Sequence, residues 1–97
     1  MNAYTITNYS KRKAKALKVI IKPSTRKDKK IDVFKQMKGK IVKVASIGTL
    51  GMNDYPTYLK TKGKKYADKR RRAYKARHAK NIKNVGTPGY YANKILW

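Results

Sequence analysis

The feature that most constrains this chain is its charge imbalance. Of 97 residues, 27 are Lys or Arg and only 4 are acidic, all of them Asp, which gives a formal net charge of +23. Like charge at this density opposes a compact free monomer through self-repulsion. The chain therefore predicts a partner that neutralises it: nucleic acid, anionic lipid or an acidic protein surface. Charge alone favours nucleic acid, because binding to phosphates releases condensed counterions.

The remaining composition favours a folded domain over a disordered tail. Hydrophobic residues make up 40% of the chain and include 8 Tyr, 1 Phe and 1 Trp, whereas disordered segments are poor in such residues. The chain is short enough for a single small core. There is no Cys to form disulfides, and no apolar run reaches the roughly 20 residues of a membrane span. We expect a basic N-terminal arm at residues 1–15 and one domain at residues 16–97.

Alternating apolar residues predict strands in the first half of the domain. Residues 17–22, 31–37 and 41–47 each alternate in the manner of a half-buried strand. The last two runs are separated by Lys38-Gly39-Lys40, where glycine accommodates the positive φ of a tight turn. We expect these two runs to form a β-hairpin, and we interpret the segment from Gly48 through Pro56 as a loop.

The second half of the domain is predicted to be helical. Residues 64–80 contain no Gly, Pro or β-branched residue and are rich in Ala, Lys and Arg, which are good helix formers. Residues 86–89, Gly-Thr-Pro-Gly, interrupt this helix, and residues 90–97 are apolar enough to form a short final helix. The expected fold class is α+β: a small antiparallel hairpin or sheet, a basic helix and a short C-terminal helix, preceded by an extended arm.

The residues needed for catalysis or metal binding are too few and too scattered. Asp28, Asp32, Asp54 and Asp68 are scattered along the sequence, and three lie within a few residues of lysines, which favour the ionised form, the wrong direction for a general acid. His78 is the only histidine, no glycine-rich phosphate-binding motif is present, and a zinc site needs about four suitable ligands. We therefore expect a protein that is not an enzyme and that has no cofactor or metal.

The basic helix contains the main candidate binding residues. Arginine suits bidentate contacts with phosphate or carboxylate, and lysine supplies a point charge. The alternative is a solvated face on which Asp68 pairs with Arg71 or Arg72, but one acid cannot neutralise so many cations. The candidates are Lys64, Lys65, Lys69, Arg70, Arg71, Arg72, Lys75, Arg77 and Lys80, with Lys11, Arg12 and Lys13 of the arm as a second contact.

Four further residues are predicted to be structural anchors. Tyr66 and Tyr74 interleave with the cations and either stack on bases or pack on the hairpin; packing is favoured. Trp97 is interpreted as a core anchor, with an exposed interface anchor as the alternative. His78 is interpreted as a structural hydrogen-bonding residue and not as a pH switch.

Five motifs follow one another along the chain from about residue 17 to its end. They are Lys22-Pro23-Ser24 before a basic stretch and hairpin, Gly51-Met52-Asn53-Asp54-Tyr55, Tyr74-Lys75-Ala76-Arg77-His78, Thr87-Pro88-Gly89-Tyr90-Tyr91 and Ile95-Leu96-Trp97. This order resembles that of a family of small basic proteins of large nucleocytoplasmic DNA viruses that infect algae and amoebae.

This resemblance implies a component of the virus particle, assembled inside the host cell. One expectation is a minor capsid protein of the cement or scaffolding type, whose cations contact acidic surfaces of neighbouring capsid proteins or lipid headgroups of an internal membrane. The alternative is a sequence-independent nucleic-acid-binding protein that packages a genome or resembles a ribosomal protein. A ribosomal protein proper explains the charge and the arm but not the order of motifs.

Overall fold

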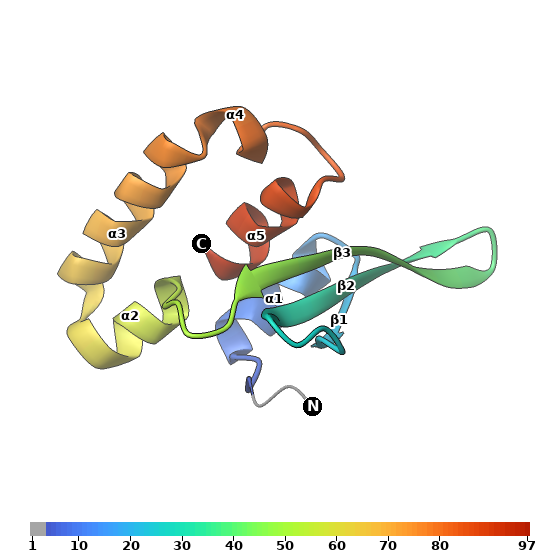
Figure 1. Cartoon of the computed structure of the whole chain (residues 1–97), viewed down its shortest axis with the longest axis horizontal. Coiled ribbons are helices and arrows are strands. Elements are labelled where there is room, and N and C mark those ends of the chain that lie inside the picture. Colours follow the sequence, from blue (N-terminus) through green and yellow to red (C-terminus); the bar gives the residue numbers. More distant parts are fainter. Residues whose placement is uncertain (1–3) are drawn as a thin grey trace.

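The structure, a computed structural model, describes residues 4–97 and has the predicted α+β architecture (Figure 1). A three-stranded antiparallel sheet of order β1-β2-β3 follows the first helix, and the remaining helices follow the sheet. The elements are α1 (Asn8–Ala16), β1 (Ile20–Pro23), β2 (Lys29–Met37), β3 (Lys40–Thr49), α2 (Tyr55–Lys62), α3 (Lys64–Arg77), α4 (Ala79–Ile82) and α5 (Pro88–Leu96).

The predicted hairpin is confirmed as β2 and β3. Met37 pairs with Lys40 across the turn, and both turn residues have positive φ, 49° at Lys38 and 79° at Gly39. Positive φ at both positions is the geometry of a type I′ turn, whose twist matches that of the flanking strands. A register shift between Val33 and Phe34 adds local twist. The outer half of the hairpin is exposed and extends beyond the helices (Figure 1).

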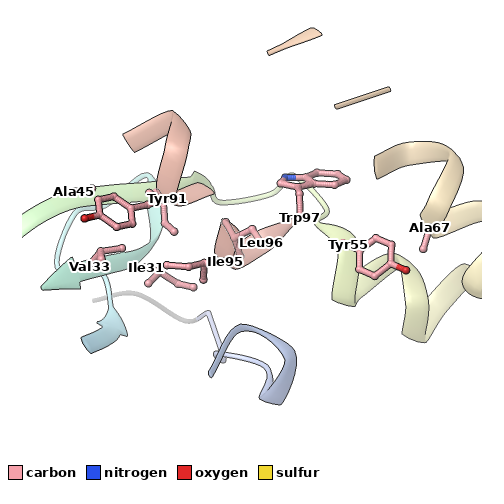
Figure 2. Close-up of a cluster of buried hydrophobic side chains, with 10 residues drawn as sticks. Ile31, Val33, Ala45, Tyr55, Ala67, Tyr91, Ile95, Leu96 and Trp97 are labelled. Atoms are coloured by element: carbon pink, nitrogen blue, oxygen red, sulfur yellow. The ribbon is translucent and has the colours of Figure 1, made fainter. Parts of the chain in front are cut away.

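The core lies between one face of the sheet and α5. Ile31, Val33 and Ile47 of the sheet are at most 1% exposed, as are Ile95 and Leu96 of α5. Figure 2 shows the cluster continuing from the sheet, through the end of α5, to Tyr55 of α2 and Ala67 of α3. Burying each such aliphatic side chain contributes about 2 kcal/mol. The short C-terminal helix is therefore a central packing element of this fold.

The predicted extended arm is wrong for residues 8–15, which form most of α1; residues 1–3 lie outside the described part of the chain. Thr7 caps the helix by accepting a hydrogen bond from the N–H of Ser10. Ser10 and Ala14 lie one turn apart and are buried, and the Ser10 hydroxyl donates to the Ile95 carbonyl at 2.9 Å. These small side chains let α1 pack closely against the last turn of α5, whose carbonyls need donors.

The loop predicted from Gly48 through Pro56 is wrong at both ends. β3 continues to Thr49, and α2 begins at Tyr55. Asp54 is the N-cap of α2 and accepts a hydrogen bond from the N–H of Thr57 at 3.0 Å. Pro56 lies in the first turn, where its missing N–H costs no helical hydrogen bond.

The basic helix is confirmed with an earlier end. α3 stops at Arg77 instead of continuing to residue 80, because His78 leaves the helical conformation with φ −108° and ψ 20°. The short helix α4 follows, and α5 begins at Pro88 after a Thr87 cap. Likewise, β1 begins at Ile20 and not at residue 17, because Leu17 caps α1 and Lys18 takes a positive φ of 59°.

Candidate polyanion-binding surface

Each of the four Asp side chains already lies beside a Lys or Arg, and two of them are buried. Asp54 is buried and accepts hydrogen bonds from Lys30 Nζ at 2.9 Å and from the Tyr4 hydroxyl at 2.9 Å. It also accepts the capping hydrogen bond from the N–H of Thr57 in α2. Burial opposes its ionisation, but the hydrogen bonds of Thr57 and Lys30 and the Lys30 charge outweigh it and lower the pKa of Asp54. Asp54 therefore joins the sheet to α2 as an ionised group.

Asp32 is the second buried carboxylate. It lies between β1 and β3 and accepts hydrogen bonds from the hydroxyls of Ser24 and Ser46, with Lys43 Nζ at 3.5 Å. Burial again opposes ionisation, yet the hydrogen bonds of Ser24, Ser46 and Thr25, with the Lys43 charge, lower the pKa of Asp32 to about 2. This carboxylate holds the three strands together on the face opposite the core.

The other two carboxylates lie nearer the surface. Asp68 accepts hydrogen bonds from Lys64 Nζ at 2.7 Å and from the Tyr55 hydroxyl at 2.7 Å, and both lower the pKa of Asp68. The sequence alternative paired Asp68 with Arg71 or Arg72; the observed ion pair runs to Lys64 instead. Asp28 lies 3.9 Å from Arg26 in an exposed pair.

Most of the cations, by contrast, face solvent. All but five of the 27 Lys and Arg side chains are exposed; those five are Lys29, Lys30, Arg70, Arg71 and Lys75. Within residues 4–97, three exposed cations pair with a carboxylate, namely Arg26, Lys43 and Lys64, and no side-chain carboxylate remains for the others. The surface therefore carries nearly the whole net charge of the protein.

The predicted binding residues divide into an exposed set and an inward set. The exposed residues of α3 and α4 are Lys64, Lys65, Lys69, Arg72, Arg77 and Lys80, and Lys11, Arg12 and Lys13 are exposed on α1. We call these nine residues the cationic surface. Arg70, Arg71 and Lys75 are half-buried and face other elements, so the four-residue cluster at 69–72 does not present all its charges to a partner.

The inward cations have structural contacts. The Arg71 guanidinium lies 3.5 Å from the centre of the Tyr55 ring and donates to the Tyr9 hydroxyl at 3.4 Å. Lys75 Nζ donates to Asn93 Oδ1 at 2.7 Å, and burial followed by the charges of Arg71, Lys13 and Lys94 lowers the pKa of Lys75. These contacts attach α3 to α1, α2 and α5. They leave less of the charge of Arg71 and Lys75 available to a partner.

The predicted anchors differ in burial. Trp97 is 9% exposed, and its ring stacks on Tyr74 with centroids 4.4 Å apart and planes 9° apart. His78 lies against the Tyr74 ring at 4.4 Å. The predicted packing of Tyr66 in the core is wrong, because Tyr66 is 41% exposed; its ring meets the Tyr58 ring of α2 with centroids 5.4 Å apart. The Tyr74 ring packs against the rings of Trp97 and His78.

Sequence reasoning missed one group of exposed cations, at the tip of the hairpin. Lys35, Lys38 and Lys40 are exposed there, beside exposed Met37 and Ile41. The signal was the regular placement of lysines on both sides of Gly39, which is typical of a solvated hairpin end. We call these three residues the hairpin-tip lysines.

The described part of the chain has neither a metal-ligand cluster nor a membrane-spanning helix. Within residues 4–97, no three His or Asp side chains come together as metal ligands would. None of the helices in that range is long and apolar enough to cross a membrane. The chain matches no protein-family model, no curated protein and no solved structure.

Proposed function

We propose that this protein is a structural component of a virus particle, a minor capsid protein that holds neighbouring capsid proteins through its cationic surface. The observation that carries the proposal is that each of the four carboxylates already lies beside a Lys or Arg of the same chain, while most of the 27 cations remain exposed. Such a surface is complementary to acidic protein patches and repels its own copies. The resemblance to small basic proteins of large DNA viruses supplies the viral setting.

The placement of the cations supports a bridging role. The cationic surface on α3 and the hairpin-tip lysines lie at opposite ends of a molecule whose longest extent is 42 Å (Figure 1). A protein with cations at both ends contacts two acidic neighbours at once. Linking two contacts raises the effective concentration of the second one, which suits a cement protein.

Fractionation of purified particles tests this proposal. Particles are opened, treated with nuclease to remove the genome and with detergent to remove lipid, and the shell is recovered. We expect the protein to remain with the shell after both treatments and to leave it in high salt, which screens exposed charges. Loss on nuclease treatment alone, loss on detergent treatment alone, or absence from the particle would each reject the capsid role.

Sequence-independent binding of nucleic acid is the second candidate. It is favoured by the spread of exposed cations over α1, α3 and the hairpin, because phosphate contacts carry no sequence information and need no single groove-reading element. Affinity for duplex DNA should then fall with salt, with a log–log slope of about −0.9 per phosphate contacted. A flat salt response, or no binding at physiological salt, would reject this candidate.

A further inference from the structure

A cavity of about 250 Å³ lies where α2, α3, α5 and the end of β3 meet. Of the nine residues of the cationic surface, only Arg77 lines this cavity. Tyr58, Tyr74 and Trp97 supply aromatic rings to this wall, and Arg70, Arg77 and His78 supply nitrogen donors. The volume is slightly below the range of about 300–1,000 Å³ typical of sites for small organic ligands. The cavity therefore suits a compact ligand.

The charge of the wall is positive. The only side-chain carboxylate among the cavity-lining residues is Asp54, whose charge is already opposed by Lys30 at 2.9 Å. Within residues 4–97, Arg70 and Arg77 form no ion pair, since the four carboxylates pair with Arg26, Lys30, Lys43 and Lys64. Two guanidinium groups on one wall, separated by two turns of the same helix, are suited to bind an oxyanion.

Arg70 gives a second reason to expect an anion. Its side chain is half-buried, with the guanidinium 5.6 Å from the centre of the Tyr58 ring. Its Nε is buried and, in the described part of the chain, has no hydrogen-bond partner. A buried donor without an acceptor costs about 1–3 kcal/mol, and such a group in a native fold calls for a missing partner. In the described part of the chain, Arg71 Nε also has no hydrogen-bond partner, but the Arg71 guanidinium lies over the Tyr55 ring and Arg71 does not line the cavity.

We propose that this cavity binds a nucleotide unit, with its phosphate held by Arg70 and Arg77 and its planar base against Tyr58 and the rim of the stacked Tyr74 and Trp97 rings. The edge of an aromatic ring packs on the π-face that every base has. The nucleotide comes either from a free mononucleotide or from an unstacked residue of a single strand. The site does not depend on the capsid role, since the exposed cations that carry that role are, apart from Arg77, outside the cavity.

Trp97 provides a direct readout because it is the only tryptophan and it lines the cavity. The full chain is titrated with adenosine monophosphate, adenosine, inorganic phosphate and a short oligothymidylate while Trp97 fluorescence is recorded. We expect saturable quenching by the monophosphate, and at least about tenfold weaker binding of adenosine, which lacks the charge-assisted hydrogen bonds. Tighter binding of the oligothymidylate than of the monophosphate assigns the site to a single strand, and the reverse assigns it to a free nucleotide.

Two matched variants test the cavity against the outer surface. Arg77→Gln and Arg72→Gln remove the same charge from exposed positions of the same helix, but only Arg77 lines the cavity. Arg77→Gln should weaken binding of the monophosphate about tenfold, whereas Arg72→Gln should change it less than about twofold. Equal effects of the two variants, equal binding of adenosine and its monophosphate, or no saturable change in Trp97 fluorescence would overturn the proposal.

Discussion

Gly48 occupies a position that no other residue fits. It has φ +76°, and a Cβ built there would lie 2.8 Å from Leu96 Cδ1 and 2.9 Å from Lys30 Cδ. Neither neighbour moves easily, because Leu96 is 1% exposed and Lys30 is fixed by its ion pair with Asp54. The glycine thus allows the end of β3 to pass directly beneath the C-terminal helix.

Substitution of Gly48 should therefore cost more than substitution of another glycine with positive φ. We expect Gly48→Ala to lower the free energy of unfolding by about 3 kcal/mol, from left-handed strain and overpacking together. Gly39→Ala is the control, since φ is +79° there and nothing lies within 4 Å of the added Cβ; it should cost about 1 kcal/mol. Urea unfolding measures both, and equal costs would contradict the close packing at Gly48.

Asp32 makes the stability of the fold sensitive to acid. Its pKa is lowered from 3.8 to about 2 in the folded protein, so its ionised form stabilises the fold at pH values above the unfolded pKa. That contribution should disappear as the pH falls from about 4 to about 2. We expect the urea midpoint to drop over this range, and Asp32→Asn to be less stable at neutral pH and to show a smaller drop.

Asp28→Asn is the matched control for this pH dependence. Asp28 is exposed, and its pair with Arg26 is 3.9 Å long, so removing its charge should leave the acid transition close to that of the unchanged protein. If Asp32→Asn showed the same loss between about pH 4 and about pH 2 as the unchanged protein, Asp32 would not be a source of the acid sensitivity.

At the scale of elements, alternation predicted the hairpin, helix-forming composition predicted α3 and the apolar C-terminal segment predicted α5, whereas α1 and α2 were not predicted. The hairpin has alternating apolar residues and a glycine turn, and α5 has an apolar face. α1 is strongly polar overall, and its buried positions are the small residues Ser10 and Ala14 among lysines. Its docking depends on a hydrogen bond to Ile95, 85 positions away, which no local pattern reveals. α2 was hidden by Pro56, although Asp54 before it was a readable N-cap signal.

The division of charges within α3 also follows from tertiary contacts. Arg70, Arg71 and Arg72 are adjacent in sequence, and composition alone does not distinguish them. Arg71 points toward Tyr55 and Tyr9 while Arg72 is exposed, because the positions of α1 and α2 decide which side of the helix is covered. The candidate residues were therefore predictable as a group, whereas their individual roles were not.

This difference predicts opposite outcomes for two neighbouring substitutions. Arg71→Gln should lower the free energy of unfolding by about 1–2 kcal/mol, because it removes the contact with the Tyr55 ring and the hydrogen bond to Tyr9. Arg72→Gln should change it by less than about 0.5 kcal/mol, as exposed substitutions usually do. Thermal unfolding compares the two, and a loss for Arg72→Gln as large as that for Arg71→Gln would show that α3 packs by a different face.

For the molecule as a whole, the fold separates anions from cations. Asp32, Asp54 and Asp68 join strands and helices, and the lysines and arginines cover the outside at both ends. Net charge was readable from composition, but this separation was not, because it depends on which Asp side chains become buried. The separation is what leaves the cationic surface and the hairpin-tip lysines available to a polyanionic partner.

The most direct test of this account is the rebinding of purified protein to capsid shells from which it has been stripped by salt. The variant Lys65→Gln/Lys69→Gln/Arg72→Gln removes exposed charges of α3, and the variant Lys35→Gln/Lys38→Gln/Lys40→Gln removes the hairpin-tip lysines. Within residues 4–97, none of these six side chains forms an ion pair, so we expect both variants to fold. Circular dichroism confirms that each is folded. We predict that each variant rebinds at least about tenfold more weakly at moderate salt, since three contacts of about 0.5 kcal/mol are lost. Rebinding equal to that of the unchanged protein by both variants would contradict the claim that the exposed cations are the binding surface.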